Sequence, residues 1–229
     1  MQKILRSIKW YFKDVFIHPF ISILYLLPTL ITVPFIGRNE LLDIFILDVD
    51  MAILPIIVLV ISIFLYREPR VEAFEINIFG SMADTFIGRI VTFLLINLLI
   101  VIPLNLVIST HEDGFLYLSP LNLKIVIYLA FISVSFLLPS YRGAFIYLSI
   151  VFLLLPYIPP ILLNRARSLN YKLDPIASII TFFIGPLTAT RYIDYLTLRW
   201  YVLEYITLFI SLVMIFISFI AYMRKEINI

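Results

Sequence analysis

The sequence has no cysteine, only two histidines and only six glycines, and each shortage excludes a class of function. Without cysteine there are no disulfides, thiolate metal sites or cysteine nucleophiles. Two histidines do not make a histidine-rich metal site. The glycines stand at positions 37, 80, 88, 114, 143 and 185, so the chain has no Gly-x-x-x-x-Gly-Lys-Ser/Thr phosphate loop and does not hydrolyse ATP by that chemistry.

Charged residues are also scarce, at 14% of 229 residues, whereas 62% of the residues are hydrophobic and the mean hydropathy is +1.07. Soluble domains carry roughly 25% charged residues, so this composition predicts an integral membrane protein. We expect one all-α polytopic transmembrane domain over residues 1–229, because six spans of about 20 residues leave room only for termini, loops and surface helices. The formal net charge of +2 gives no indication of a nucleic-acid partner.

The N-terminal residues 1–18 predict an amphipathic helix at the membrane interface. Apolar residues recur at helical spacing, and most of the charged residues fall on the other side: Lys3, Arg6, Lys9, Lys13 and Asp14. Such a helix lies in the headgroup plane with its apolar face towards the acyl chains, so membrane lipids are expected partners. The same pattern fits a passive anchor and a lever that carries motion to a transport pathway. No small-residue cleavage site follows, so we do not interpret this segment as a signal peptide.

Six apolar runs predict six transmembrane helices, over residues 20–36, 51–66, 90–108, 123–139, 143–163 and 200–222. Acidic residues are expected in an outside loop after the first run: Asp43, Asp48 and Asp50. Cations flank the opposite side of the membrane, in the N-terminal helix and at Arg67, Arg70, Arg224 and Lys225. The positive-inside rule therefore predicts a multi-pass protein of the cell membrane with both termini in the cytoplasm.

Residues 164–199 predict an extracellular or re-entrant segment before the sixth span. The apolar run 176–184 is too short to cross about 30 Å as a helix, and Gly185-Pro186 ends it. The positive-inside rule disfavours cations in a segment that lies outside. This segment nevertheless contains five: Arg165, Arg167, Lys172, Arg191 and Arg199. A seven-span alternative, in which the 176–184 run crosses the membrane and the C-terminus lies outside, stays open.

A second amphipathic helix is predicted between the second and third spans, over residues 68–86. Its apolar residues recur at helical intervals, and its polar side is acidic, with Glu68, Glu72, Glu75 and Asp84. Anionic lipids repel an acidic face, so a helix that docks a protein partner and an ordinary interfacial loop helix both fit. If the helix docks in a groove, Phe74, Ile78 and Phe79 are the expected apolar anchors, with Glu72 and Glu75 on the rim.

The sequence predicts no enzyme active site, cofactor or metal. There is no His-Glu-x-x-His, no Gly-x-Ser-x-Gly and no pair of carboxylates within the expected spans. The one acid near a span interior is Glu204, for which we expect Arg199 or a cation of the preceding segment such as Arg191 as partner. His111, Glu112 and Asp113 are adjacent loop residues that do not converge on one ion, so we expect them to be solvated.

The order of these elements resembles the membrane subunits of exporter-type ATP-binding cassette (ABC) transporters, the ABC type 2 permeases. The family shares an amphipathic N-terminal helix, six spans, a cytoplasmic coupling helix between spans two and three, and broken helices before span six. The local resemblance lies in Arg67-Glu68 for the charged start of the coupling helix, Glu72 or Glu75 for its acid, Ile76 and Ile78 for its aliphatic pair, and Gly88-Arg89 for the Gly-Lys that opens span three. The family's Gly-Thr pair and the proline after the helix are absent.

The resemblance implies the permease subunit of an ATP-driven exporter. A separate ATPase subunit would bind the coupling helix through Glu68, Glu72, Phe74, Glu75, Ile78 and Phe79. A second permease subunit, as homodimer or heterodimer, would complete the substrate path. The alternatives are a stand-alone secondary transporter and a structural membrane subunit. The absence of an internal repeat, and of any deep intramembrane acid or base in the expected spans, speaks against the secondary transporter.

Overall fold

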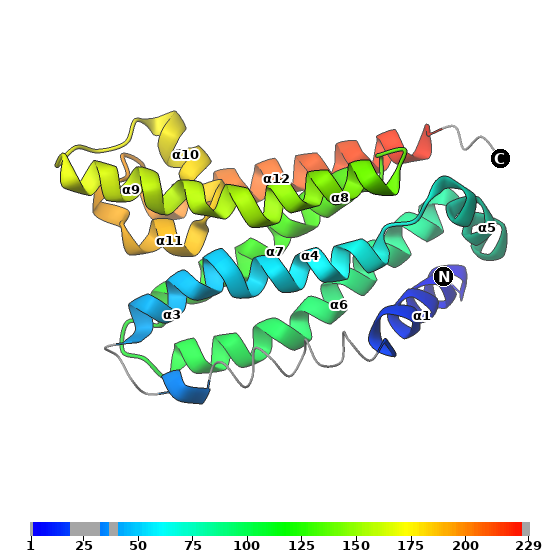
Figure 1. The fold of residues 1–229 in the computed structure, drawn as a ribbon, viewed down its shortest axis with the longest axis horizontal. Coiled ribbons are helices and arrows are strands. Elements are labelled where there is room, and N and C mark those ends of the chain that lie inside the picture. Colours follow the sequence, from blue (N-terminus) through cyan, green and yellow to red (C-terminus); the bar gives the residue numbers. More distant parts are fainter. Residues whose placement is uncertain (1, 19–32, 37–40, 226–229) are drawn as a thin grey trace.

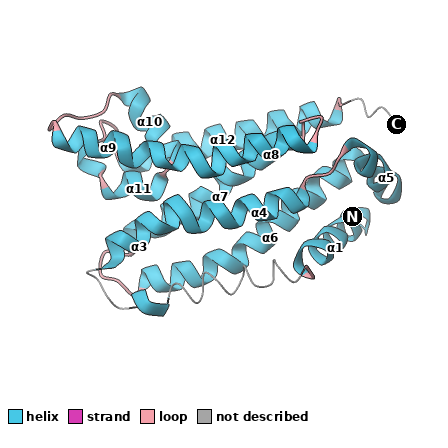
Figure 2. Ribbon diagram, in the orientation of Figure 1, coloured by secondary structure: helices cyan, strands magenta, loops and turns pink. Residues whose placement is uncertain are grey.

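A computed structural model describes residues 2–18, 33–36 and 41–225 of the chain. Within these residues all regular structure is helical, as Figure 2 shows. In the described part of the chain, five helices are long and apolar enough to cross a membrane. The all-α, multi-pass character expected from composition is therefore confirmed. Most of the first expected span, over residues 20–36, lies outside the described residues, so the count of six remains a prediction.

The five candidate spans differ from the expected runs mainly in where they begin and end. They are Leu42–Leu65, Met82–Ser109, Phe115–Ser135, Tyr141–Ser168 and Trp200–Met223. The first comprises α3 (Leu42–Asp48), a π-turn (η3, Val49–Ile53) and α4 (Leu54–Leu65); α6 and α7 are the second and third. The fourth comprises α8 (Tyr141–Ser149), a π-turn (η4, Ile150–Leu154), a 3-10 turn (η5, Leu155–Tyr157) and α9 (Ile158–Ser168), and α12 is the fifth.

The prediction that Asp43, Asp48 and Asp50 lie in a loop was wrong. All three lie on the helix that begins at Leu42, within α3 and the π-turn that follows it. The helix forms because four apolar residues at helical spacing share one buried face: Leu42, Phe45, Ile46 and Val49. Asp43 and Asp48 lie on the exposed side, whereas Asp50 is buried with the apolar face.

The two ends of the helical bundle carry different short helices (Figure 1). At one end lie α1 (Gln2–Phe16), α5 (Pro69–Phe79) and the C-terminal end of α12. α1 packs on α6 through a buried side that includes Tyr11 and Val15, and its cations remain exposed, as expected of an amphipathic helix. At the other end lie α9, α10 (Pro175–Ile184) and α11 (Pro186–Arg191).

Gly185 separates α10 from α11, and we call these two helices with Gly185 the broken-helix segment. α10 has ten residues, which makes it about 15 Å long, half of what a span needs. Asp174 caps α10 by accepting a hydrogen bond from the Ala177 amide at 2.9 Å, and Pro186 lacks the N–H that would continue the helix. The 176–184 run therefore forms a short helix that ends at Gly185, as expected, and its re-entrant or interfacial location stays a prediction.

Candidate functional site

The short helix α5 ends earlier than the sequence predicted. It covers Pro69–Phe79, not residues 68–86, and residues from Met82 onward begin α6. Gly80 has a φ of +92° and closes α5 in the left-handed conformation that glycine adopts without strain. Ser81 then caps α6, because its hydroxyl oxygen accepts a hydrogen bond from the Asp84 amide at 3.0 Å. The Gly-Ser-x-x-Asp spacing is a helix-stop and helix-start signal that the sequence already contained.

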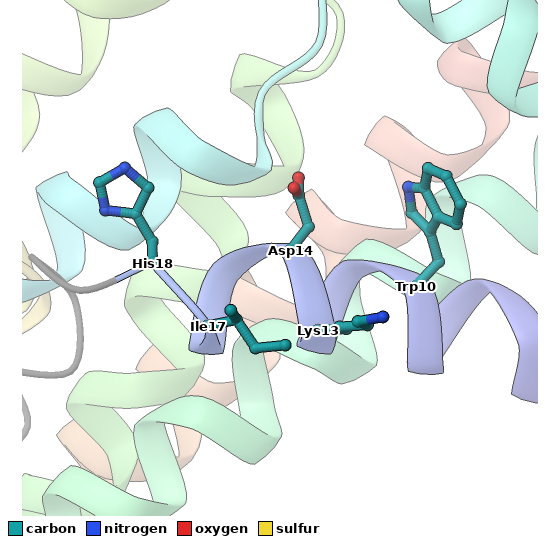
Figure 3. A pocket seen from close by; sticks show the side chains of 5 residues that line it. All are labelled: Trp10, Lys13, Asp14, Ile17 and His18. Carbon is teal, nitrogen blue, oxygen red and sulfur yellow. The ribbon is translucent and has the colours of Figure 1, made fainter.

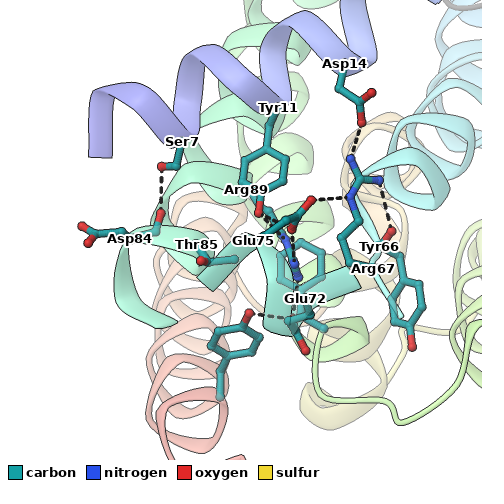
Figure 4. A network of polar contacts seen from close by, with 12 residues as sticks. Ser7, Tyr11, Asp14, Tyr66, Arg67, Glu72, Glu75, Asp84, Thr85 and Arg89 are labelled. Carbon is teal, nitrogen blue, oxygen red and sulfur yellow. Dashed lines mark hydrogen bonds and ion pairs between the residues drawn. The ribbon is translucent and has the colours of Figure 1, made fainter. Parts of the chain in front are cut away.

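The acidic residues of α5 point into the protein (Figure 4). Glu72 is fully buried, and its Oε1 accepts hydrogen bonds from Arg89 Nη1 at 2.8 Å and from the Tyr222 hydroxyl at 2.6 Å. Its Oε2 accepts a hydrogen bond from Lys225 Nζ at 2.8 Å. One carboxylate thus joins α5 to α6 and to the C-terminal end of α12.

Glu75 makes a second set of contacts one turn further along α5. Its Oε2 accepts hydrogen bonds from Arg89 Nη2 at 3.0 Å and from the Tyr11 hydroxyl at 2.6 Å. Its Oε1 accepts from Arg67 Nε at 2.8 Å, and Arg67 also pairs with Asp14 of α1. This carboxylate therefore ties α5 to α1 and to the end of the preceding span.

Arg89 lies at the centre of this group, which we call the charge cluster: Tyr11, Asp14, Arg67, Glu72, Glu75, Arg89, Tyr222 and Lys225. Its guanidinium is fully buried and packs over the rings of Tyr11 and Phe136, 5.5 and 5.3 Å from their centroids. Three cations face three carboxylates in the cluster, so its formal charge balances. Balance matters because an unpaired charge in a low-dielectric interior costs several kcal/mol.

The protonation states of the cluster follow from burial and from these partners. Burial raises the pKa of Glu72, but the charges of Arg89 and Lys225 and the hydrogen bonds to it outweigh burial and hold the pKa below its usual value. Burial raises the pKa of the Tyr11 hydroxyl, so Tyr11 remains protonated and donates to Glu75. Burial and the nearby carboxylates Glu72 and Glu68 raise the pKa of Tyr66 to about 12.

The six residues predicted to bind a partner divide into two groups. Glu68, Phe74 and Ile78 are exposed, with Phe74 exposed by 61%. The other three, Glu72, Glu75 and Phe79, are buried. Phe79 packs edge-on against the rings of Trp10 and Tyr11 of α1. A partner-anchoring role for Phe79 and a rim role for the two acids therefore do not agree with their positions.

The orientation of α5 has a physical cause. The buried cation Arg89 requires carboxylate partners, and Glu72 and Glu75 lie one turn apart on the same side of α5 to supply them. The opposite side carries three exposed apolar residues, Val71, Phe74 and Ile78, and two exposed polar ones, Arg70 and Asn77. We call these five residues the docking face. The Arg in Gly88-Arg89, close to an apolar run, is the signal that could have predicted this arrangement.

A second buried ion pair lies far from the charge cluster along the chain. Lys124 Nζ of α7 donates to Asp50 Oδ1 at 2.6 Å and to the Ile184 carbonyl at 2.8 Å. Asp50 Oδ2 accepts hydrogen bonds from the Thr188 amide at 2.8 Å and from the Thr188 hydroxyl at 2.6 Å. Both charged side chains are buried, so the expectation of no deep intramembrane acid or base was wrong.

Other candidate residues form no site. Glu204 does not pair with Arg199, which donates to the Tyr201 hydroxyl at 3.1 Å. A hollow of about 500 Å³ beside α1 is lined by Trp10, Lys13, Asp14, Ile17 and His18 (Figure 3). The described lining residues come from one helix and the turn after it, and Asp14 already pairs with Arg67. Across the described ranges, no group of three or more His, Asp or Glu side chains is arranged to hold a metal ion.

Comparison of the sequence with protein-family models and with curated proteins gives no relationship from which a function could be transferred. No protein-family model matches the chain, and no curated protein is significantly similar in sequence. The features of the chain that bear on its function are the charge cluster, the docking face and the second ion pair.

Proposed function

We propose that the chain is the permease subunit of an ATP-driven exporter. In this proposal two permease subunits enclose the substrate path in the cell membrane, and a separate ATPase subunit binds α5 on the cytoplasmic side. The observation that carries the proposal is that α5 presents exposed apolar side chains while its acids fix it to the spans. The order of the elements, with α1 before the spans and the broken-helix segment before the last one, agrees with the permease resemblance.

The docking face has the composition of a helix that binds in a groove. Phe74 and Ile78 lie one turn apart and supply apolar anchors, and Arg70 and Asn77 supply a polar rim. Anchors of this kind contribute most of the binding energy of an interface, and rim residues contribute little. Phe74 is therefore the residue whose truncation most directly tests the proposal.

The charge cluster explains how movement of α5 could reach the membrane. Arg89 belongs to α6, Tyr222 belongs to the C-terminal end of α12, and Lys225 follows α12 by two residues, so Glu72 and Glu75 connect the docking helix to two candidate spans. Tyr11 adds α1 to the same network. Because buried ion pairs resist separation, a displacement of α5 by an ATPase moves these elements together with it. This connection also favours a lever over a passive anchor for α1.

Copurification of an ATPase tests the proposal. We expect gentle extraction from native membranes to retain an ATPase that contains a phosphate loop and hydrolyses ATP. Phe74→Ala is expected to weaken its binding by about 2 kcal/mol or more, roughly 30-fold. Phe216→Ala is the matched control, because Phe216 is exposed by 63% on α12, in a candidate span. The proposal fails if no such ATPase copurifies with the unmutated chain, or if both variants retain it equally.

A stand-alone secondary transporter is the second candidate function, and the buried Asp50–Lys124 pair favours it. Secondary transporters place ionisable groups near the membrane midplane beside broken helices, as this pair lies beside Gly185. This function needs no ATPase. The copurification experiment therefore separates the two candidates.

A further inference from the structure

The Asp50–Lys124 pair connects three parts of the chain that are distant in sequence. Asp50 belongs to the π-turn that precedes α4, Lys124 to the middle of α7, and Thr188 to α11. Lys124 lies nine residues after the start of α7, which is about 14 Å along the helix and close to the middle of a bilayer core of about 30 Å. Ionisable groups at that depth are costly and mark functional positions by default.

The contacts of the pair are arranged around the break between α10 and α11. Lys124 donates to the carbonyl of Ile184, the last residue of α10, where helical carbonyls have no partner within the helix. Asp50 accepts the amide and the hydroxyl of Thr188 on the other side of the break. A β-carbon at Gly185 would lie 3.1 Å from Asp50 Oδ2 and 2.9 Å from a Pro159 side-chain carbon, so the backbone approaches this closely only with glycine. Each charge therefore has a specific counterpart on the broken-helix segment.

Stability alone does not account for such a pair. A buried ion pair usually contributes no more than well-packed apolar residues of the same volume, but removing one partner is strongly destabilising. The pair therefore makes the attachment of the segment all-or-none, because partial separation leaves two buried charges without partners. Such bistable contacts are what conformational switches are built from.

We propose that Asp50, Lys124 and Thr188 form a latch that holds the broken-helix segment closed against the spans, and that release of this latch opens the end of the bundle opposite α5. The segment can move as a unit because α10 and α11 are short and Gly185 breaks the helix between them. The contacts of the latch lie within the chain itself. The inference therefore holds whether or not an ATPase binds α5.

Thiol labelling tests the latch directly, because the chain contains no cysteine. Ala189→Cys introduces a buried thiol on α11 next to Thr188, and Ser62→Cys introduces a buried control thiol on α4. Each is combined with Asp50→Asn or Lys124→Met, and labelling by N-ethylmaleimide is followed in purified protein in lipid nanodiscs. We expect labelling at position 189 to accelerate by about tenfold or more, with labelling at position 62 unchanged.

Two results would overturn the latch. Unchanged labelling at position 189 would show that the pair does not hold the segment, and equal acceleration at both positions would show that it stabilises the whole bundle. Should Lys124→Met or Asp50→Asn fail to fold, Thr188→Val removes one donor to Asp50 and leaves the ion pair, and the same comparison applies with a smaller acceleration.

A charge swap provides a second, independent test. In Asp50→Lys combined with Lys124→Asp, the carboxylate would face the Ile184 carbonyl and the ammonium would face the Thr188 amide. We therefore expect the swap to leave position 189 as rapidly labelled as in the single variants. Recovery of slow labelling would contradict the assignment of each charge to its own side of the break.

Discussion

Arg89 of α6 is a buried cation, and the two carboxylates with which it pairs belong to α5. Its guanidinium donates to Glu72 and Glu75 of α5 and packs on two aromatic rings. Two bonds to two carboxylates use the planar geometry of the guanidinium, which a lysine ammonium does not reproduce. The residue therefore fixes both the position and the orientation of α5.

Replacement of Arg89 is expected to be severe. Arg89→Leu leaves Glu72 and Glu75 buried with fewer cations, and we expect a loss of about 3–5 kcal/mol in the free energy of unfolding. Arg142→Leu, at an exposed position on α8, is expected to change it by less than about 0.5 kcal/mol. Thermal unfolding in detergent measures both, and equal melting temperatures for the two variants would contradict the central role of Arg89.

The lowered pKa of Glu72 predicts a dependence of stability on acid pH. A carboxyl group whose pKa in the folded state lies below its ordinary value of 4.5 contributes its full stability above pH 4.5. That contribution is lost as the pH falls from about 4.5 through the lowered pKa. We expect the melting temperature of Glu72→Gln to be lower than that of the unmutated chain at pH 7 and to change less between pH 5 and pH 3. A parallel decline of the two proteins in that window would count against the assignment.

At the scale of the element, the division between α5 and α6 depends on Gly80. This residue has a positive φ, which costs an alanine about 1 kcal/mol or more. We expect Gly80→Ala to lower the free energy of unfolding by about that amount, whereas Gly143→Ala, in the first turn of α8, changes it little or raises it. Denaturant unfolding followed by circular dichroism compares the two, and an unaffected Gly80→Ala would contradict a required left-handed cap.

Sequence patterns predicted the helices better than their faces and ends. Apolar runs identified the spans because a bilayer imposes a minimum length on any crossing helix. They missed the helix start at Leu42, because Asp43, Asp48 and Asp50 dilute its hydrophobicity while the buried positions keep their helical spacing. The orientation of α5 was also missed, since an amphipathic pattern shows that a helix has two faces but not which face is inward.

The site was predictable only where it depends on neighbours in sequence. Phe74 and Ile78 were recognised from their spacing on one helix. The partners of Glu72 are Arg89 of α6, Tyr222 of α12 and Lys225, which follows α12. Likewise, Lys124 is a single cation in an apolar run, and the sequence does not indicate its partner. That partner, Asp50, lies 74 positions earlier in the chain. Contacts between residues so distant in sequence can be identified only when the fold is known.

At the scale of the whole molecule, the two polar sites lie towards opposite ends of the bundle. The charge cluster is at the end that carries α1, α5 and the C-terminal end of α12, and the Asp50–Lys124 pair contacts the broken-helix segment at the other end (Figure 1). An exporter needs a point of coupling on one side of the membrane and a gate towards the other. The separation of the two polar sites agrees with the proposed function in either orientation of the chain.

Topology can be measured with introduced cysteines. We expect Glu112→Cys, in the loop between α6 and α7, to react with an impermeant thiol reagent added outside cells, and Asn77→Cys on α5 to react only after permeabilisation. Both positions are exposed on the chain itself. An ATPase bound to the docking face would slow labelling of position 77 after permeabilisation, but it would not make position 77 accessible from outside. A thiol at Glu75 would not serve as a reporter, because Glu75 is buried and its thiol would be protected on either side of the membrane. Outside labelling at position 77 would invert the proposed orientation.

Photo-crosslinking from the docking face tests the central claim most directly. The photoreactive amino acid p-benzoylphenylalanine is placed at Phe74 or at Phe216, which have similar exposed fractions of 61% and 63%. After irradiation in native membranes, the account predicts that position 74 crosslinks to a phosphate-loop ATPase and that position 216 does not. Absence of such an ATPase adduct from position 74 would contradict the account.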